Sequence, residues 1–189
     1  MERRKRYCPF CGERLKMRTD AGRERLYCAA EDRLVYENPI PAATAIVTDT
    51  AGRILLVLRS CEPGAGQWAL PGGFVENGES PAEAARRELE EETGLRGDDP
   101  QLVDVIHQES RYYAASLLIV GYRFARFEGV LLPADDAAEA KFFDPAELPA
   151  LAFESHRRLI DAARLRLSSA RQPLRRPAQP RRSAAPRRS

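Results

Sequence analysis

Three glutamates that could hold metal ions fall within five residues of each other, namely Glu88, Glu91 and Glu92. Their spacing of three and four places the carboxylates on one stripe of a helix, where like charges repel each other. They also occupy the C-terminal half of a helix predicted over 80–93, where the helix dipole disfavours negative charge. Bound divalent cations would relieve both effects, and Mg²⁺ or Mn²⁺ suits such hard oxygen ligands and bridges to substrate phosphates.

The same glutamates could instead form a solvated acidic helix face, balanced by Arg86 and Arg87. For the glutamates alone this interpretation would be preferred, because acidic helix faces are common. Their surroundings follow a fixed pattern, which runs Gly73, five residues, Glu79, seven residues, Arg87-Glu88-Leu89, one residue, Glu91-Glu92, one residue, Gly94-Leu95. Such a set of identities arises by chance on the order of 10⁻⁸ times per starting position, at ordinary residue frequencies.

The pattern matches the Nudix box at every defined position, so the chain resembles a Nudix hydrolase over roughly 39–168. The resemblance implies an α/β/α sandwich with a mixed sheet, and hydrolysis of a nucleoside diphosphate linked to another group. It implies that the metal ligands are Glu88, Glu91 and Glu92. It also implies a turn at Gly73 that lets backbone carbonyls approach the metal, and a pair between Glu79 and Arg87. The box residues with a structural role are then Gly73, Glu79, Arg87 and Gly94.

Cleavage of a pyrophosphate bridge requires a carboxylate that takes a proton from the attacking water. Divalent ions would lower the pKa of that water and neutralise the oxygens on which charge develops. The proton acceptor could be a glutamate of the box, Glu91 or Glu92. Members of the resembled family often place it on a loop near the last strand, and there we favour Glu139 or Asp136. A solvated acidic loop is the alternative for these two residues.

A second metal site is indicated by cysteines near the N-terminus. Cys8 and Cys11 have the spacing of a metal knuckle, and Cys28 stands where a second knuckle would begin. This segment resembles the zinc ribbon that precedes the Nudix domain in NADH-pyrophosphatase-like members, but Glu31 replaces the fourth cysteine. A carboxylate oxygen can ligate zinc, so we expect a structural Zn²⁺ held by Cys8, Cys11 and Cys28, with Glu31 or else Asp32 as the fourth ligand. The alternative is a ribbon that folds without metal.

Two aromatic residues are candidates for substrate binding, Trp68 just before the box and Tyr112 after it, with core packing as the alternative for both. The histidines, His107 and His156, are expected to be structural or exposed. The zinc-ribbon relatives cleave dinucleotides such as NADH, but the chain lacks the Ser-Gln-Pro-Trp stretch of NADH-specific members. The segment 151–156 is more similar to members that act on ADP-ribose or FAD.

We therefore expect a small-molecule nucleotide substrate of the ADP-ribose, FAD or NADH type. One alternative is a nucleoside triphosphate pyrophosphohydrolase of the sanitising type. The other is a Nudix-like sensor that binds a nucleotide without cleaving it. The intact set of three glutamates argues against a sensor, since a protein that only binds has no need of their repulsion.

Helix and strand signals place the box between strands. Over 80–93, Ser80 is a good N-cap, Pro81 suits the first helical turn and Glu83 completes a capping box. Gly94 supplies the C-terminal stop. Further strands are predicted at 67–70, 102–107, 116–127 and 140–143, a hairpin at 42–49 and 53–59, and a closing helix at 153–167. This order indicates a mixed sheet covered by helices on both faces.

Composition divides the chain into three parts: a zinc-ribbon-like module at 1–38, a Nudix domain at 39–168 and a basic tail at 169–189. The 189 residues have a net charge of +2, but residues 1–163 carry 21 basic and 28 acidic side chains. The tail is poor in apolar residues and is expected to be disordered. No apolar run reaches the ~20 residues of a membrane span and no secretory signal is recognisable. We expect a cytoplasmic protein, with nucleic acid an improbable partner and a homodimer conceivable.

Overall fold

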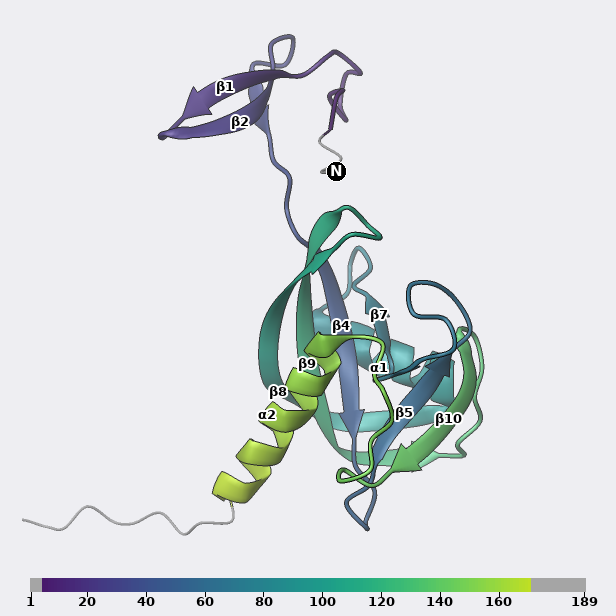
Figure 1. The fold of residues 1–189 in the computed structure, drawn as a ribbon. Helices are drawn as coiled ribbons and strands as arrows, with labels where there is room; N and C mark the ends of the chain where they lie inside the picture. The colour runs from purple at the N-terminus through teal and green to yellow at the C-terminus, as the bar shows by residue number, and fades with distance from the viewer. Residues whose placement is uncertain (1–4, 171–189) are drawn as a thin grey trace, which may run out of the picture.

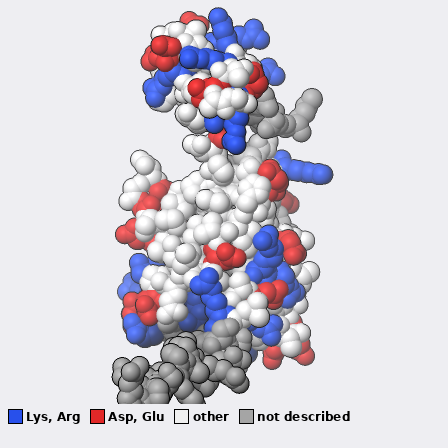
Figure 2. Space-filling view, turned by 90° about the vertical axis from the view of Figure 1, so that its left-hand side faces the viewer, with Lys and Arg blue, Asp and Glu red and all other residues white. Residues whose placement is uncertain are grey.

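The computed structural model describes residues 5–170 and divides them into a small N-terminal module and a larger body (Figure 1). The module is an antiparallel sheet in the order β1 (Lys16–Asp20), β2 (Arg23–Cys28) and β3 (Arg33–Val35). Its core consists of a few side chains, namely Cys8, Leu15, Leu26, Cys28 and Val35. Acidic and basic side chains are intermixed on the module's surface (Figure 2). Of the predicted basic tail, 171–189 lie outside the described residues.

The body contains two sheets. One has the order β7 (Gly72–Phe74), β4 (Ile40–Val47), β9 (Ala115–Gly129) and β8 (Leu95–Ser110). It is mixed, because β4 runs parallel to β9 and antiparallel to β7. The other has the order β10 (Ala137–Phe143), β5 (Ile54–Arg59) and β6 (Trp68–Ala69), all antiparallel.

Two helices, α1 (Pro81–Thr93) and α2 (Glu154–Ala170), pack on opposite faces of β4. Ala43, Ala45 and Val47 belong to the cluster that contains Ala84, Ala85 and Leu89 of α1. The alternate residues Ala42 and Ile46 belong to the cluster that contains Leu159 and Ile160 of α2. Because successive side chains of a strand point to opposite faces, β4 is buried on both. The prediction of a mixed sheet covered on both faces is confirmed.

The predicted hairpin at 42–49 and 53–59 is wrong, although both strands and the turn between them exist. A single bridge, Thr48 to Ile54, joins the two strands before they separate into different sheets. Both edges of β4 are taken by β7 and β9, and both edges of β5 by β10 and β6. Pairing between distant strands therefore replaces the local pairing that the turn alone suggested.

Helix α1 has the predicted ends. Ser80 accepts from the Glu83 backbone N–H while the Glu83 carboxylate accepts from the Ser80 N–H, which is a complete capping box. Gly94 ends the helix in the left-handed conformation, with φ of 71°. Among residues 5–170, no helix is long and apolar enough to cross a bilayer.

Candidate functional site

A cavity of about 590 Å³ lies where α1, the turn into β7 and the loop before β10 meet. The three box glutamates line it, together with both acids of the loop, Asp135 and Asp136. The β8–β9 turn and the first turn of α2 contribute its other walls. Seven carboxylates and three arginines line the cavity, so a polyphosphate could approach only with cations present.

Glu92 is the most deeply buried of these carboxylates, at 4% exposed. Its Oε2 accepts a hydrogen bond of 3.0 Å from the backbone N–H of Gly72, which fixes the carboxylate beneath the turn. Burial raises the pKa of Glu92 to about 8, and the neighbouring charge of Glu88 adds to the effect. An ionised carboxylate in this position is stabilised by a cation, which makes Glu92 a suitable metal ligand.

Arg87 holds the other acids of the box in place. Its guanidinium donates to both carboxylate oxygens of Glu79, at 3.2 and 2.8 Å. Its Nη1 also donates to Glu88 Oε1 at 2.8 Å and to Glu91 Oε2 at 2.9 Å. A further bond of 3.1 Å reaches the carbonyl of Phe74. The implied pair of Arg87 and Glu79 is thus present, and hydrogen bonds from Arg87 lower the pKa of Glu79.

The two glycines of the turn allow it to approach its neighbours closely. A Cβ on Gly73 would lie 2.4 Å from Oε1 of Glu88, and one on Gly72 would lie 2.4 Å from the carbonyl oxygen of Ala43. Gly72 also has φ of +154°, which side chains rarely adopt. The turn can therefore lie against α1 at Gly73 and against β4 at Gly72 only because both positions lack a side chain.

The donor set fits a divalent cation. Glu88, Glu91 and Glu92 present acceptor-only oxygens to the cavity, of the hard type that Mg²⁺ and Mn²⁺ prefer. Within residues 5–170 the three carboxylates are not gathered within ligand distance of one another. Glu88 and Glu91 are turned to Arg87, and Glu92 to the N–H of Gly72. The guanidinium thus supplies part of the positive charge that a cation would bring.

The two loop candidates for proton acceptor differ in position. Asp136 lines the cavity, and its Oδ2 accepts from the thiol of Cys61 at 3.1 Å. Glu139 is exposed on β10, opposite Leu58, and does not line the cavity. An irregularity in the ladder between Ala137 and Glu139 changes the register there. The geometry therefore disfavours Glu139, and the proton-acceptor role of Asp136 stays a prediction.

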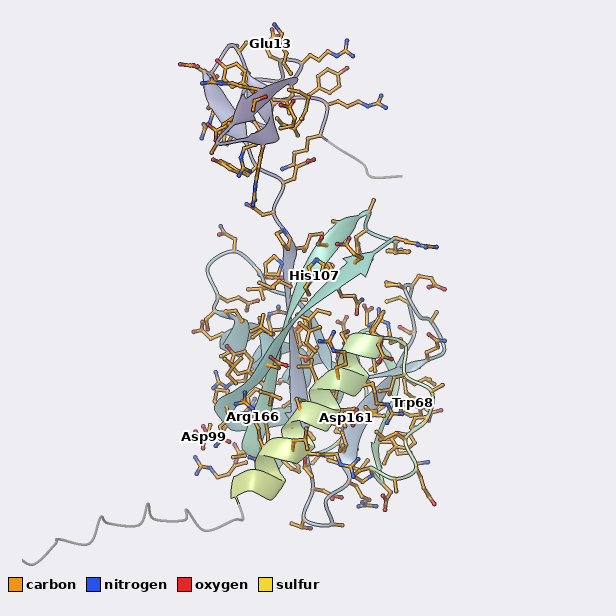
Figure 3. All side chains as sticks on the ribbon, turned by 60° about the vertical axis from the view of Figure 1, so that its left-hand side comes forward. Glu13, Trp68, Asp99, His107, Asp161 and Arg166 are labelled. Carbon is orange, nitrogen blue, oxygen red and sulfur yellow. The ribbon has the colours of Figure 1, made fainter. Side chains whose placement is uncertain are left out.

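The remaining candidates also separate. Tyr112 lines the cavity and is 61% exposed, in edge contact with Tyr113. Trp68 does not line it, because its ring packs edge-on against Phe143. In Figure 3, His107 lies on β8, well away from Trp68. Thr44, Arg59 and His156 are among the lining residues that were not foreseen as part of the site. No motif singles them out, since each reaches the cavity through tertiary packing.

In the N-terminal module the Sγ atoms of Cys8, Cys11 and Cys28 lie within 4.8 Å of one another. Cys8 and Cys28 are buried, and the Cys11 and Cys28 sulfurs are 3.5 Å apart. Glu31 is exposed and does not belong to this group, so the structure does not support it as the fourth ligand. The ladder of β2 and β3 ends at the pair of Cys28 and Arg33, so Glu31 lies in the exposed turn between the two strands.

Comparisons with known proteins point to one family. The family model described as NUDIX domain matches residues 38–163. An ADP-ribose pyrophosphatase of Methanocaldococcus jannaschii is 39% identical over 67% of this chain and 73% of its own length. An NAD-capped RNA hydrolase, NudC of Stutzerimonas stutzeri, is 32% identical over 77% of this chain, which spans half of that relative. The crystal structure of a NUDIX hydrolase from Nitrosomonas europaea matches with a TM-score of 0.65 and 23% identity, over 89% of this chain and 95% of that one.

Proposed function

The chain belongs to the NUDIX family of hydrolases that act on the pyrophosphate linkages of nucleotide derivatives, and on that premise we propose that its substrate is ADP-ribose. FAD and NADH, as nucleoside diphosphate derivatives of the same kind, are the next candidates. The observation that carries the proposal is the cavity, which continues from the box carboxylates to the β8–β9 turn and to α2. A substrate with a group on each side of its pyrophosphate would place the pyrophosphate at the carboxylates and the two groups beside the β8–β9 turn and α2.

In this proposal Glu88, Glu91 and Glu92 hold Mg²⁺ or Mn²⁺. The cations would neutralise the charge on the phosphoryl oxygens of the pyrophosphate and lower the pKa of the attacking water. Arg87 orients Glu88 and Glu91 through Nη1, and Asp136 accepts the proton of the water. Hydrolysis of ADP-ribose adds one water across the P–O–P bridge and yields AMP and ribose 5-phosphate.

The direct test is a screen of hydrolysis across ADP-ribose, FAD, NADH, coenzyme A and the deoxynucleoside triphosphates, each with Mg²⁺ and with Mn²⁺. We expect ADP-ribose to have the highest kcat/KM and to yield AMP. Faster release of pyrophosphate from a triphosphate would favour the sanitising alternative. Tight binding of ADP-ribose without turnover of any substrate would favour a sensor.

For the N-terminal module we propose a structural Zn²⁺ held by Cys8, Cys11 and Cys28. The supporting observation is the convergence of three sulfurs in a module with only four buried side chains, two of them Cys8 and Cys28, a core that is too small to be stable alone. Thiolate sulfur is a preferred zinc ligand.

Purified protein is expected to contain about one zinc per chain by mass spectrometry of the metal, with Cys8→Ser reducing the content to near zero. Cys61→Ser is the matched control and should retain the metal, because Cys61 belongs to the body, where its thiol donates to Asp136, and not to the group of three sulfurs. Equal zinc content in wild type and Cys8→Ser would contradict the site.

A further inference from the structure

His156 is a buried histidine that lines the catalytic cavity without belonging to the box. It lies in the first turn of α2, is 6% exposed, and contacts the ring of Phe153 edge-on. Its Nδ1 accepts a hydrogen bond of 3.0 Å from the backbone N–H of Leu70. In a neutral imidazole one nitrogen accepts and the other donates. The proton of His156 is therefore on Nε2.

Within residues 5–170 no hydrogen bond to Nε2 is present, so this donor is available to a ligand. The charge state is equally fixed, because burial, and next the positive charge of Arg59, lower the pKa of His156 to about 3. The group thus remains a neutral donor at any pH at which the enzyme would work.

Thr44 provides a second unpartnered polar group among the residues that line the cavity. It lies on β4 between Ala42 and Ile46, whose side chains pack in the cluster of α2, so its own side chain faces the α2 layer. The residue is 3% exposed, lines the cavity, and its Oγ1 has no hydrogen-bond partner among the described residues. A buried hydroxyl without a partner costs free energy, which a ligand could recover.

We infer that His156 and Thr44 bind the uncharged part of the nucleotide, by donating to a neutral acceptor such as a ring nitrogen of the base or a hydroxyl oxygen of the sugar. The inference rests on the proposed function for the placement of the phosphates at the box carboxylates. The cavity lining includes four apolar side chains, namely Ala42, Leu117, Ile119 and Phe153, and the guanidinium carbon of Arg59 lies 5.4 Å from the centre of the Phe153 ring. Largely apolar walls with a few polar groups are typical of the sites that hold a base or sugar.

The test is calorimetric titration of AMP and of ribose 5-phosphate, the two expected products, in the presence of Mg²⁺. His156→Asn keeps an oxygen that can accept from Leu70 but removes the donor at the Nε2 position. Thr44→Val removes the hydroxyl at nearly constant volume. We expect each variant to bind one of the two products with an affinity about tenfold lower than that of the wild type, the factor that corresponds to ~1.4 kcal/mol. Weaker binding of AMP alone places the acceptor on the adenosine, and weaker binding of ribose 5-phosphate alone places it on the terminal ribose.

Ser155→Ala is the matched control, because Ser155 also has a buried hydroxyl without a partner but does not line the cavity. Thr44→Val and Ser155→Ala should both retain or raise the melting temperature. Of these two variants, only Thr44→Val should have a lower affinity for a product. Unchanged affinities in both cavity variants, or no measurable binding of either product to wild type, would overturn the inference. Hydrolysis of ADP-ribose is measured separately: binding through His156 without hydrolysis rejects the proposed function alone.

Discussion

Glu92→Gln is expected to lower kcat/KM for ADP-ribose by on the order of 100-fold or more, while making the metal-free protein more stable. The rate falls because the substitution removes a charged ligand from the metal site, and metal stabilisation of developing charge is worth several kcal/mol. The amide oxygen can still accept from Gly72, so the turn is kept.

The stability effect has the opposite sign because Glu92 is buried at 4% exposure and its pKa is raised from 4.5 to about 8. A group whose pKa is raised by folding stabilises the folded state fully below its unfolded pKa, and this contribution is lost as the pH rises through the folded pKa. In metal-free wild type the loss therefore develops between about pH 4.5 and 8. The glutamine variant does not undergo it.

Melting temperatures in chelator at pH 5 and pH 8 measure the difference. We expect the variant to exceed wild type at pH 8 by at least ~2 °C, which is about 1 kcal/mol for a chain of this size, and by less at pH 5. Glu90→Gln is the matched control, since Glu90 is exposed on the same helix and pairs with Arg96. Unchanged activity in Glu92→Gln, or equal stability at both pH values, would contradict the assigned role.

Arg87→Lys is expected to have the second largest effect, with losses of both stability and activity. Arg87 makes five hydrogen bonds to four groups, including Glu79 through two nitrogens, and a lysine ammonium cannot reproduce that fork. Glu79, Glu88 and Glu91 would lose much of the positive charge that neutralises them. We expect a destabilisation of about 2–4 kcal/mol, because partly buried carboxylates would be left without their partner.

Activity should fall by on the order of 10- to 100-fold, the range for residues that orient metal ligands. Chemical denaturation and titration with Mg²⁺ measure the two losses separately. Arg86→Lys provides the comparison, because Arg86 lies on the same helix and donates only to the Gly97 carbonyl. An Arg87→Lys protein that binds Mg²⁺ as wild type does would show that the guanidinium is not needed to position the carboxylates.

These two variants test different parts of one arrangement. Glu92 is held by the backbone of the turn, whereas Glu88 and Glu91 are held by a side chain of their own helix. A cation entering the site therefore meets one buried carboxylate that is costly to ionise and two that are already partly neutralised. We expect Glu92 to contribute most to the metal affinity for this reason.

The features that depend on local sequence could be predicted from it. The spacing of Glu88, Glu91 and Glu92 places them on one helical stripe whatever surrounds the helix, and Ser80, Glu83 and Gly94 determine where that helix begins and ends. The cysteine spacing likewise brings Cys8 near Cys11. In each case the interacting groups are a few residues apart, so the geometry of a helix or knuckle relates them directly.

The tertiary structure alone decided which distant residues meet. His156 reaches Leu70 across 86 positions, and Asp136 lines the cavity whereas Glu139, on β10, does not. The strands flanking the turn at Thr50 separate because each finds partners far along the chain. Strand pairing and helix docking depend on how much apolar surface the whole fold buries. That total cannot be predicted from any short segment of the sequence.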